Sequence, residues 1–145
     1  MAFGTRHSLA VRTIDHLAER IAIAYKLAAM EVDGNLVSVA ALKNPTPART
    51  ERTFTKAKTS GHDGFSLELG WVFTDEPYRG RKYCPALLEE LLSTVEEPIY
   101  ATARQENFGI RKILPHFGFE NVGVPYEGRK KAMISLFTRP GGQLL

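Results

Sequence analysis

The spacing of apolar residues changes between Phe65 and Val95, and this change constrains the fold more than any other feature of the chain. At first, large apolar residues alternate with other residues: Phe65, Leu67, Leu69, Trp71 and Phe73. This period of two predicts a strand over 65–73. Later, the apolar residues recur at helical spacing: Leu87, Leu88, Leu91, Leu92 and Val95. This pattern predicts a helix with Pro85 at its first position, where a missing N–H costs nothing.

The rest of the chain supplies further elements on both sides of this strand and helix. A helix is predicted over 13–24, and Asp33-Gly34 predicts a tight turn between strands at 26–32 and 35–43. After the helix that begins at Pro85, the pattern predicts a strand at 99–103, a helix at 107–114, and strands at 118–125 and 131–138. No repeat is visible, and we expect one domain over residues 1–145.

Composition excludes several functional classes. The chain has one cysteine, and its four histidines lack metal-ligand spacing, so we expect no metal site. A net charge of +3 is too small to imply nucleic-acid binding by itself. No apolar run is long enough to span a membrane and Met1 to Arg12 does not resemble a secretory signal, so we expect a cytoplasmic protein.

Residues 44–64 are rich in threonine, proline and basic side chains. We expect a long loop here, and such a loop inside a domain is uncommon unless it binds something or is disordered. Both interpretations stay open, and Phe54 indicates that part of the segment is ordered.

The junction from Tyr78 to Pro85 joins the best-defined strand to the best-defined helix. Free backbone amides and the positive end of a helix form a natural phosphate site, and Arg79, Arg81 and Lys82 add positive charge there. The alternative is an ordinary connection with solvated basic residues.

Gly70 interrupts the predicted strand, and a glycine there often marks the close approach of a ligand. Glu68 lies on the same face two residues earlier, which makes its carboxylate a general-base candidate. The alternative is a carboxylate that is paired with a basic neighbour.

These residues resemble the GNAT superfamily of acyl-CoA-dependent N-acetyltransferases. The main motif of that family, Arg/Gln-x-x-Gly-x-Gly/Ala, is matched in degenerate form by Arg79 to Cys84. A later signature, in which a strand, an asparagine and a helix precede Gly-Phe, is similar to Ala101–Asn107 followed by Phe117-Gly118-Phe119. The resemblance covers about 65–139, and it implies an α+β or α/β domain with a mixed sheet of six to seven strands and three to four helices.

The resemblance also implies roles for individual residues. Acetyl-CoA would be the acyl donor, and its pantetheine arm would pair with the backbone of Val72, Phe73 and Thr74. The pyrophosphate would be held by the amides of the motif: Arg79, Gly80, Arg81, Lys82, Tyr83 and Cys84. Asn107 would contact the pantetheine or its phosphate end. The two strands at 65–73 and 98–103 would part to admit the thioester. Glu68 would deprotonate the acceptor ammonium for direct attack on the thioester.

The sequence departs from the family pattern at several positions. Lys82 and Cys84 replace the motif glycines, and Pro85 removes an amide that could have bound phosphate. Leu114 stands where many members have a tyrosine that protonates the departing thiolate. His116 is the nearest titratable candidate for that role, although a histidine at a helix end also suits free carbonyl groups.

The function predicted is an acetyl-CoA-dependent N-acetyltransferase that acts on a primary amine. Two alternatives stay open: an acyltransferase acting on a nucleic-acid-borne amine, ranked below a free or peptide amine, and a non-catalytic module that senses acyl-CoA or binds a protein. The family resemblance is also compatible with a homodimer.

Overall fold

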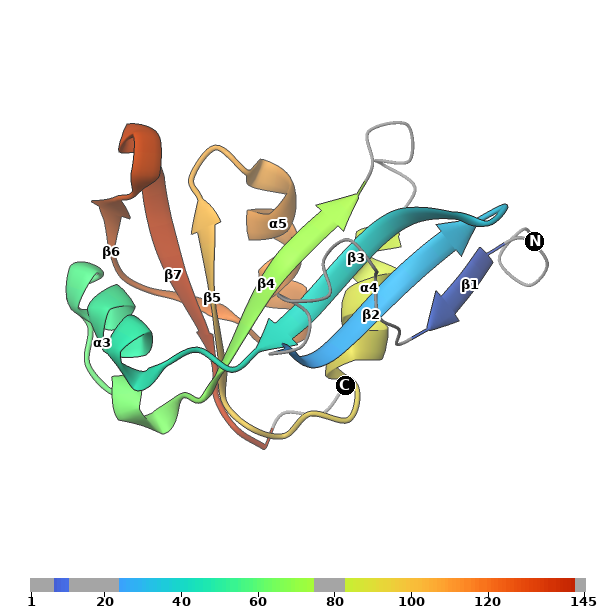
Figure 1. The fold of residues 1–145 in the computed structure, drawn as a ribbon. Helices are drawn as coiled ribbons and strands as arrows, with labels where there is room; N and C mark the ends of the chain where they lie inside the picture. Colours follow the sequence, from blue (N-terminus) through green and yellow to red (C-terminus); the bar gives the residue numbers. More distant parts are fainter. Residues whose placement is uncertain (1–6, 11–23, 75–82, 143–145) are drawn as a thin grey trace. The chain divides into compact units, whose positions relative to one another are not determined.

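The structure is a computed structural model that describes residues 7–10, 24–74 and 83–142 (Figure 1). Residues 13–23 of the helix predicted at 13–24, and Arg79 to Lys82 of the motif, lie outside the described residues. The chain divides into two compact units. Unit 1 comprises residues 1–43, 70–94 and 145, and unit 2 comprises residues 44–69 and 95–144.

Unit 1 contains a meander of antiparallel strands and one helix. Its strands β1 (His7–Ala10), β2 (Ala24–Val32) and β3 (Asn35–Lys43) lie in this order, and the second half of β4 (Leu67–Thr74) follows β3. The turn between β2 and β3 has positive φ at Asp33 and Gly34, which confirms the predicted hairpin. Strand β1 was not predicted.

Helix α4 (Tyr83–Leu92) packs on β2 and β3 within unit 1. The predicted leucines form its buried face: Leu87, Leu88, Leu91 and Leu92 are each 0% exposed. Lys26 of β2 binds the end of the helix, since its Nζ donates to the carbonyl oxygen of Leu91 at 3.1 Å and to Thr94 Oγ1 at 3.2 Å. A cation at this place also suits the negative end of the helix.

Unit 2 contains a mixed sheet in the order β4-β5-β7-β6. Leu67–Leu69 of β4 pair in parallel with β5 (Ile99–Arg104), and β5 pairs antiparallel with β7 (Met133–Arg139). Strand β6 (Glu120–Glu127) pairs antiparallel with β7. Helical segments complete the unit: α3 (Pro47–Lys56), η2 (His62–Gly64), α5 (Phe108–Ile113), η4 (Leu114–Phe117) and η5 (Arg129–Lys131).

The predicted fold class is confirmed. The described residues form seven strands with both parallel and antiparallel pairs, together with three α-helices, as expected for a mixed α+β fold. No helix among the described residues is long and apolar enough to cross a membrane.

The prediction of a long loop at 44–64 was wrong, because Pro47–Lys56 forms α3. Thr46 caps the helix by accepting from Arg49 N at 3.2 Å, and Pro47 occupies the first turn. Its buried face contains Thr50 and Thr53 beside Phe54, so the helix has no apolar periodicity in its sequence.

The end of α3 docks on the edge strand β6. The carbonyl oxygen of Ala57 accepts from Val124 N at 2.9 Å. The preceding residue, Gly123, has a φ of +68°, and a Cβ there would overlap the same carbonyl oxygen. Glycine is therefore required at position 123 by both its backbone conformation and the close approach of the helix.

Candidate carboxylate site

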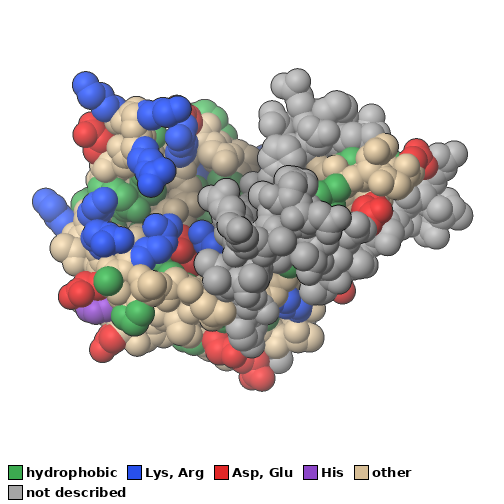
Figure 2. Space-filling view, viewed as in Figure 1, with side chains coloured by type: hydrophobic (Ala, Val, Ile, Leu, Met, Phe, Trp, Pro, Cys, Tyr) green, Lys and Arg blue, Asp and Glu red, His purple; other side chains and the backbone are tan. Residues whose placement is uncertain are grey.

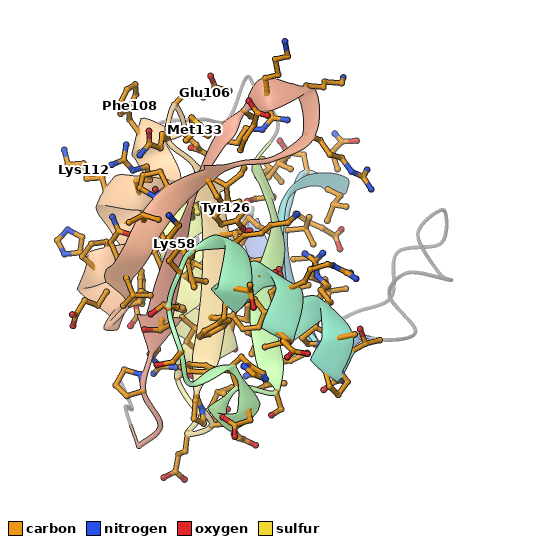
Figure 3. All side chains as sticks on the ribbon, turned by 90° about the vertical axis from the view of Figure 1, so that its left-hand side faces the viewer. Lys58, Glu106, Phe108, Lys112, Tyr126 and Met133 are labelled. Carbon is orange, nitrogen blue, oxygen red and sulfur yellow. The ribbon has the colours of Figure 1, made fainter. Side chains whose placement is uncertain are left out.

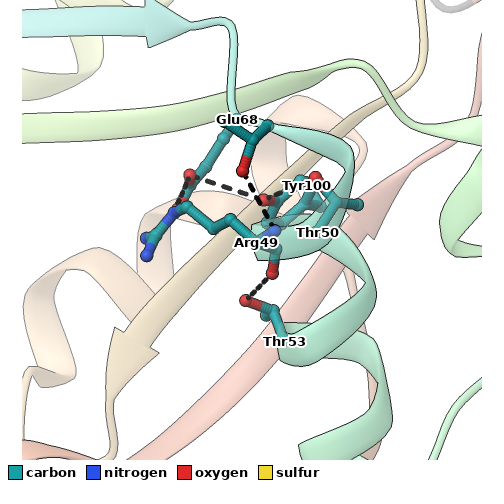
Figure 4. Close-up of polar contacts among 6 residues, drawn as sticks. Arg49, Thr50, Thr53, Glu68 and Tyr100 are labelled. Atoms are coloured by element: carbon teal, nitrogen blue, oxygen red, sulfur yellow. Dashed lines mark hydrogen bonds and ion pairs between the residues drawn. The ribbon is translucent and has the colours of Figure 1, made fainter.

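Glu68 lies on β4 inside unit 2 and is 2% exposed. Arg49, in the first turn of α3, reaches it with two parallel hydrogen bonds (Figure 4). Arg49 Nε donates to Glu68 Oε1, and Arg49 Nη2 donates to Glu68 Oε2, both at 3.0 Å. This is the two-point guanidinium–carboxylate geometry that makes an ion pair directional and strong.

Two hydroxyl groups extend this ion pair into a cluster. Tyr100 lies opposite Glu68 in the β4–β5 register, and its hydroxyl donates to Glu68 Oε1 at 3.5 Å. The Tyr100 hydroxyl also hydrogen-bonds to Thr50 Oγ1 at 3.1 Å (Figure 4). We call Arg49, Thr50, Glu68 and Tyr100 the carboxylate cluster.

Aromatic packing holds the tyrosine in place. The Phe54 and Tyr100 rings meet edge to face with centroids 5.4 Å apart, and Phe65 lies 5.2 Å from Phe54. Such contacts add to area burial and fix ring orientation. The cluster is therefore built by α3, β4 and β5 around one small aromatic core.

The electrostatics follow from burial and from this ion pair. The hydrogen bond to Glu68 raises the pKa of Arg49, although burial opposes it. Burial raises the pKa of Tyr100 to about 12, so its hydroxyl keeps its proton at neutral pH. Burial also raises the pKa of Tyr126, with the Arg49 charge opposing and the Glu68 charge adding to the shift.

The sequence left two interpretations of Glu68 open, a general base and a carboxylate paired with a basic neighbour. In the structure Glu68 is paired with Arg49. The carboxylate contacts a basic neighbour, but that neighbour is a half-exposed side chain: 47% of the Arg49 side chain is accessible, against 3% for Glu68. Solvent therefore reaches the arginine while the carboxylate lies behind it.

The glycine at position 70 permits a close approach to the β4 backbone, as predicted, but the approaching group is the side chain of Lys43. A Cβ at position 70 would lie 2.5 Å from Lys43 Cε and 2.9 Å from Lys43 Nζ, both within unit 1. The space that the glycine opens is thus occupied by the side chain of Lys43, and the prediction of a ligand there stays a prediction.

The described part of α4 starts at Tyr83, so the helix already includes Tyr83 and Cys84 before Pro85, its predicted first residue. Burial raises the pKa of the Cys84 thiol to about 11, which makes it a poor nucleophile at neutral pH.

The other predicted site residues of unit 2 lie on α5 and η4. Asn107 caps α5, since its Oδ1 accepts from Ile110 N at 3.2 Å. His116 is exposed in η4, whereas Leu114, the residue at the family's tyrosine position, is 0% exposed. A buried leucine at that position packs in the core and carries no proton to donate.

Arg49, Thr50 and Tyr100 were not among the predicted site residues. The Thr46-Pro47 pair was an available signal, because a capping threonine before proline indicates a helix start. The pairing of Arg49 with Glu68 had no local signal, since the two residues are 19 positions apart. Among the described residues, no group of three or more His, Cys, Asp or Glu side chains is arranged to hold a metal ion.

Comparison with known proteins gives a match at the level of structure. No family model and no curated protein sequence matches the chain. The structure of Naa50 from Arabidopsis thaliana, solved with the bisubstrate analogue CoA-Ac-MVNAL, matches with a TM-score of 0.66 and 14% identity, over 93% of this chain and 99% of that one. A GNAT-family acetyltransferase from Bacillus cereus matches with a TM-score of 0.62 and 14% identity, over 93% and 97%. The chain has the GNAT fold.

A further GNAT-fold match is yncA from Salmonella typhimurium, solved with its cofactor acetyl-CoA. It has a TM-score of 0.63 and 16% identity, over 89% of this chain and 75% of that one. The fold predicted from the motif order is thus confirmed, while identities this low establish the fold alone. The opening expected between β4 and β5 and the roles of the motif residues stay predictions.

Proposed function

We propose that this chain is an acyl-CoA-dependent N-acyltransferase that transfers an acetyl group from acetyl-CoA to a primary amine. The observation that carries the proposal is the position of α4. Its described part follows directly after the basic residues of the motif, with Tyr83 and Cys84 preceding Pro85 in the helix. Helix N-termini bind phosphate through their backbone amides and through the helix dipole.

The donor site in this proposal uses backbone groups. Val72, Phe73 and Thr74 form the end of β4 and would pair with the pantetheine arm as an added strand. The amides from Arg79 to Cys84, including those of Gly80, Arg81, Lys82 and Tyr83, would hold the pyrophosphate. The side-chain oxygen of Asn107 is already used in capping α5, so a contact with CoA would come from its NH₂ group.

Glu68 is the proposed general base. The acceptor ammonium gives one proton to the Glu68 carboxylate, directly or through a water, and the neutral amine attacks the thioester carbonyl carbon. The C–S bond then breaks, and the departing CoA thiolate takes the second proton of the attacking nitrogen, either directly or through His116, which gives one proton to the thiolate and accepts the one from the nitrogen. Atoms and charge balance without a covalent enzyme intermediate.

Arg49 acts in this mechanism as a positioning residue. Its two hydrogen bonds orient both carboxylate oxygens of Glu68, and its accessible guanidinium stands on the solvent side of the pair. An acceptor ammonium carries the same charge and the same kind of donors. It can therefore replace the guanidinium at the carboxylate or approach it through a water.

The first experiment is thermal unfolding with acetyl-CoA, with CoA, and with ATP as the control. A ligand at 100 times its Kd stabilises the folded state by about 2.7 kcal/mol, which gives a clear shift of the midpoint. Shifts with acetyl-CoA and CoA but not with ATP support the donor site. No shift at millimolar acetyl-CoA contradicts it.

Turnover then tests the base. Glu68→Gln keeps the size of the side chain and should abolish acetyl transfer to an amine panel while leaving the acetyl-CoA shift intact. Unchanged turnover in Glu68→Gln removes this residue from the mechanism.

A second candidate function is favoured by one observation, the Arg49–Glu68 ion pair itself. A buried carboxylate that is already paired suits a structural role, as in a non-catalytic module that binds acyl-CoA or a protein. This alternative predicts the acetyl-CoA shift without turnover on any amine. A single domain over 1–145, a cytoplasmic location and a homodimer also remain predictions.

A further inference from the structure

The Arg49–Glu68 ion pair lies at the border between a covered and a more open part of one sheet face in unit 2. Residues two apart in a strand share a face, and the strand register places Glu68, Tyr100 and Leu136 on the face that α3 covers. Glu68 is 2% exposed, and the other two are each 0% exposed. Further along, the same face continues with three half-buried side chains: Thr102, Ile134 and Tyr126.

Tyr126 of β6 is a neighbour of the ion pair on this face. Its ring packs against the core that includes Phe54 and Tyr100, and Figure 3 shows it on the α3 side of the sheet. Burial raises the pKa of Tyr126 most, and the charges of Arg49 and Glu68 also act on this pKa. Because the pKa values of both tyrosines are raised, both stay neutral at neutral pH. The charges that a ligand meets beside them are therefore those of the ion pair.

Arg49 keeps hydrogen-bond donors that its bond with Glu68 does not use. A guanidinium carries five N–H groups in one plane. Two of these, on Nε and Nη2, point to Glu68, so the other three do not. Since 47% of the Arg49 side chain is accessible, a ligand can reach these donors from solvent. A planar group with several parallel donors is well suited to bind a carboxylate.

The two charges of the pair favour a ligand that carries both signs. In the proposed function, an acceptor ammonium approaches Glu68, which places a second cation beside Arg49. Like charges this close weaken a complex, unless a further anion compensates them. A carboxylate on the acceptor itself supplies that anion and pairs with the unused donors of Arg49. Because both bonds of the ion pair are 3.0 Å long, the two charges of the acceptor must also be adjacent, as they are on one carbon atom.

The surface of α3 adds to this preference. The helix has three basic residues and one acidic residue, Glu51, and all three basic side chains are exposed: Arg49, Arg52 and Lys56. Figure 2 shows Lys and Arg side chains gathered over this part of unit 2. Such a surface attracts an anionic group and repels a polyamine or a basic peptide.

We propose that the acceptor is a free α-amino acid, whose ammonium meets Glu68 and whose carboxylate is bound by Arg49. This inference rests on the proposed function and gives Arg49 a contact of its own with the substrate, in addition to positioning Glu68. The bonds that form and break are those of the transfer given above, and the products are an N-acetylamino acid and CoA. A peptide N-terminus, a lysine side chain and a polyamine lack a carboxylate on the carbon that bears the amine.

The test is isothermal titration calorimetry of the full chain, with CoA present so that no acetyl group can be transferred, and again without CoA. The standard L-amino acids are titrated. Each one that binds is compared with its amide and with its decarboxylated amine, for example phenylalanine with phenylalaninamide and phenethylamine. We expect the amino acid to bind about tenfold more tightly than either analogue, because only the amino acid offers a carboxylate to a charged donor.

Arg49→Gln should reverse this order of affinities. The substitution takes the Arg49 charge away from the buried Glu68 carboxylate, so the decarboxylated amine should bind more tightly than to the parent chain. The amino acid should lose about tenfold, since its carboxylate loses a charged partner. A gain in affinity for the amine excludes misfolding as the cause of the loss for the amino acid.

Two further variants are matched to this one. Arg49→Lys keeps the charge without the two-point geometry, so its loss of affinity for the amino acid should be smaller than that of Arg49→Gln. Arg52→Gln removes an exposed arginine three residues later on the same helix and should leave all three affinities unchanged.

Four outcomes overturn the proposal: no binding of any L-amino acid with or without CoA, equal affinities for an amino acid and its two analogues, an order that Arg49→Gln leaves unchanged, or equally tight binding of a peptide that begins with aspartate. The last result points to a protein N-terminus as the acceptor.

Binding is measured without transfer, so the proposed function fails separately. An amino acid that binds in the expected order but receives no acetyl group from acetyl-CoA contradicts the enzyme and supports the amino-acid site. Equal acetyl transfer to amino acids, amides and simple amines supports the enzyme and overturns the amino-acid class.

Discussion

Arg49 and Glu68 form a two-point ion pair that joins the first turn of α3 to strand β4, with both hydrogen bonds at 3.0 Å. The carboxylate is buried and the guanidinium is half-exposed. The pair thus connects the docking of a helix to the orientation of the proposed base. In the proposed mechanism, one arrangement of side chains would serve both the stability of unit 2 and its chemistry.

Removing the guanidinium should destabilise the chain. Arg49→Gln deprives a buried carboxylate of its cation, and we expect the free energy of unfolding to fall by about 2 kcal/mol. Arg49→Lys should lose less, because it keeps the charge but not the two-point geometry. Urea unfolding measures both. In the double variant Arg49→Gln/Glu68→Gln the loss should be smaller than the sum of the single losses; strict additivity would show that the pair contributes no coupling.

The Tyr100 hydroxyl should make the chain unstable in alkali. Its pKa is about 12 in the folded chain, against 10.0 for an ordinary tyrosine, so the unfolded state loses this proton first as pH rises. This contribution to stability is complete below pH 10 and is lost progressively towards pH 12. Unfolding midpoints across this range, compared with those of Tyr100→Phe, measure it. A pH dependence of the same size in Tyr100→Phe would assign the loss to other groups.

Gly123→Ala should weaken the docking of α3. The new methyl group would overlap the Ala57 carbonyl oxygen, and the residue would occupy a left-handed conformation that costs about 1–2 kcal/mol by itself. We therefore expect a total loss above that figure in denaturant unfolding. Two controls separate the causes: Gly61→Ala also has a positive φ, of +90°, but open space, and Gly64→Ala has open space without positive φ. Equal losses in Gly123→Ala and Gly61→Ala would show that the contact with Ala57 is unimportant.

Cys84 should be unreactive in the folded chain. With a pKa of about 11 rather than 9.0, its thiolate is roughly a hundredfold scarcer near pH 8 than that of an ordinary cysteine. Alkylation by iodoacetamide should be correspondingly slow and should accelerate in urea. Cys84→Ala should retain any acetyl transfer of the parent chain, and loss of transfer with acetyl-CoA binding preserved would show that the thiol takes part.

Elements with clean apolar periodicity were predictable from the sequence. The alternation from Phe65 to Phe73 corresponds to β4, which the structure places at Leu67–Thr74. The leucines after Pro85 correspond to α4, whose described part already includes Tyr83 and Cys84 before the proline. The degenerate motif between them predicted the GNAT fold that the structural comparisons confirm.

The site was predictable in part. Glu68 was selected from its place in a strand, but its partner Arg49 lay in a segment expected to be a loop. The buried threonines of α3 hide its periodicity, and they are accepted in the interior because their hydroxyls are bonded: Thr50 to Tyr100, and Thr53 to the Arg49 carbonyl oxygen. Their burial depends on partners that local sequence does not reveal.

The sequence by itself determined the elements with clean apolar patterns, such as β4 and α4, since alternation and helical spacing act between near neighbours in the chain. The tertiary structure alone decided that Arg49 neutralises Glu68, that Tyr100 joins them across 32 positions, and that Lys43 lies over Gly70. Burying a carboxylate is costly unless a cation and donors meet it, and in this chain they come from other elements. Apolar periodicity predicts which face of a helix or strand is buried. The residues that contact this face come from other elements, so they are decided only by tertiary packing.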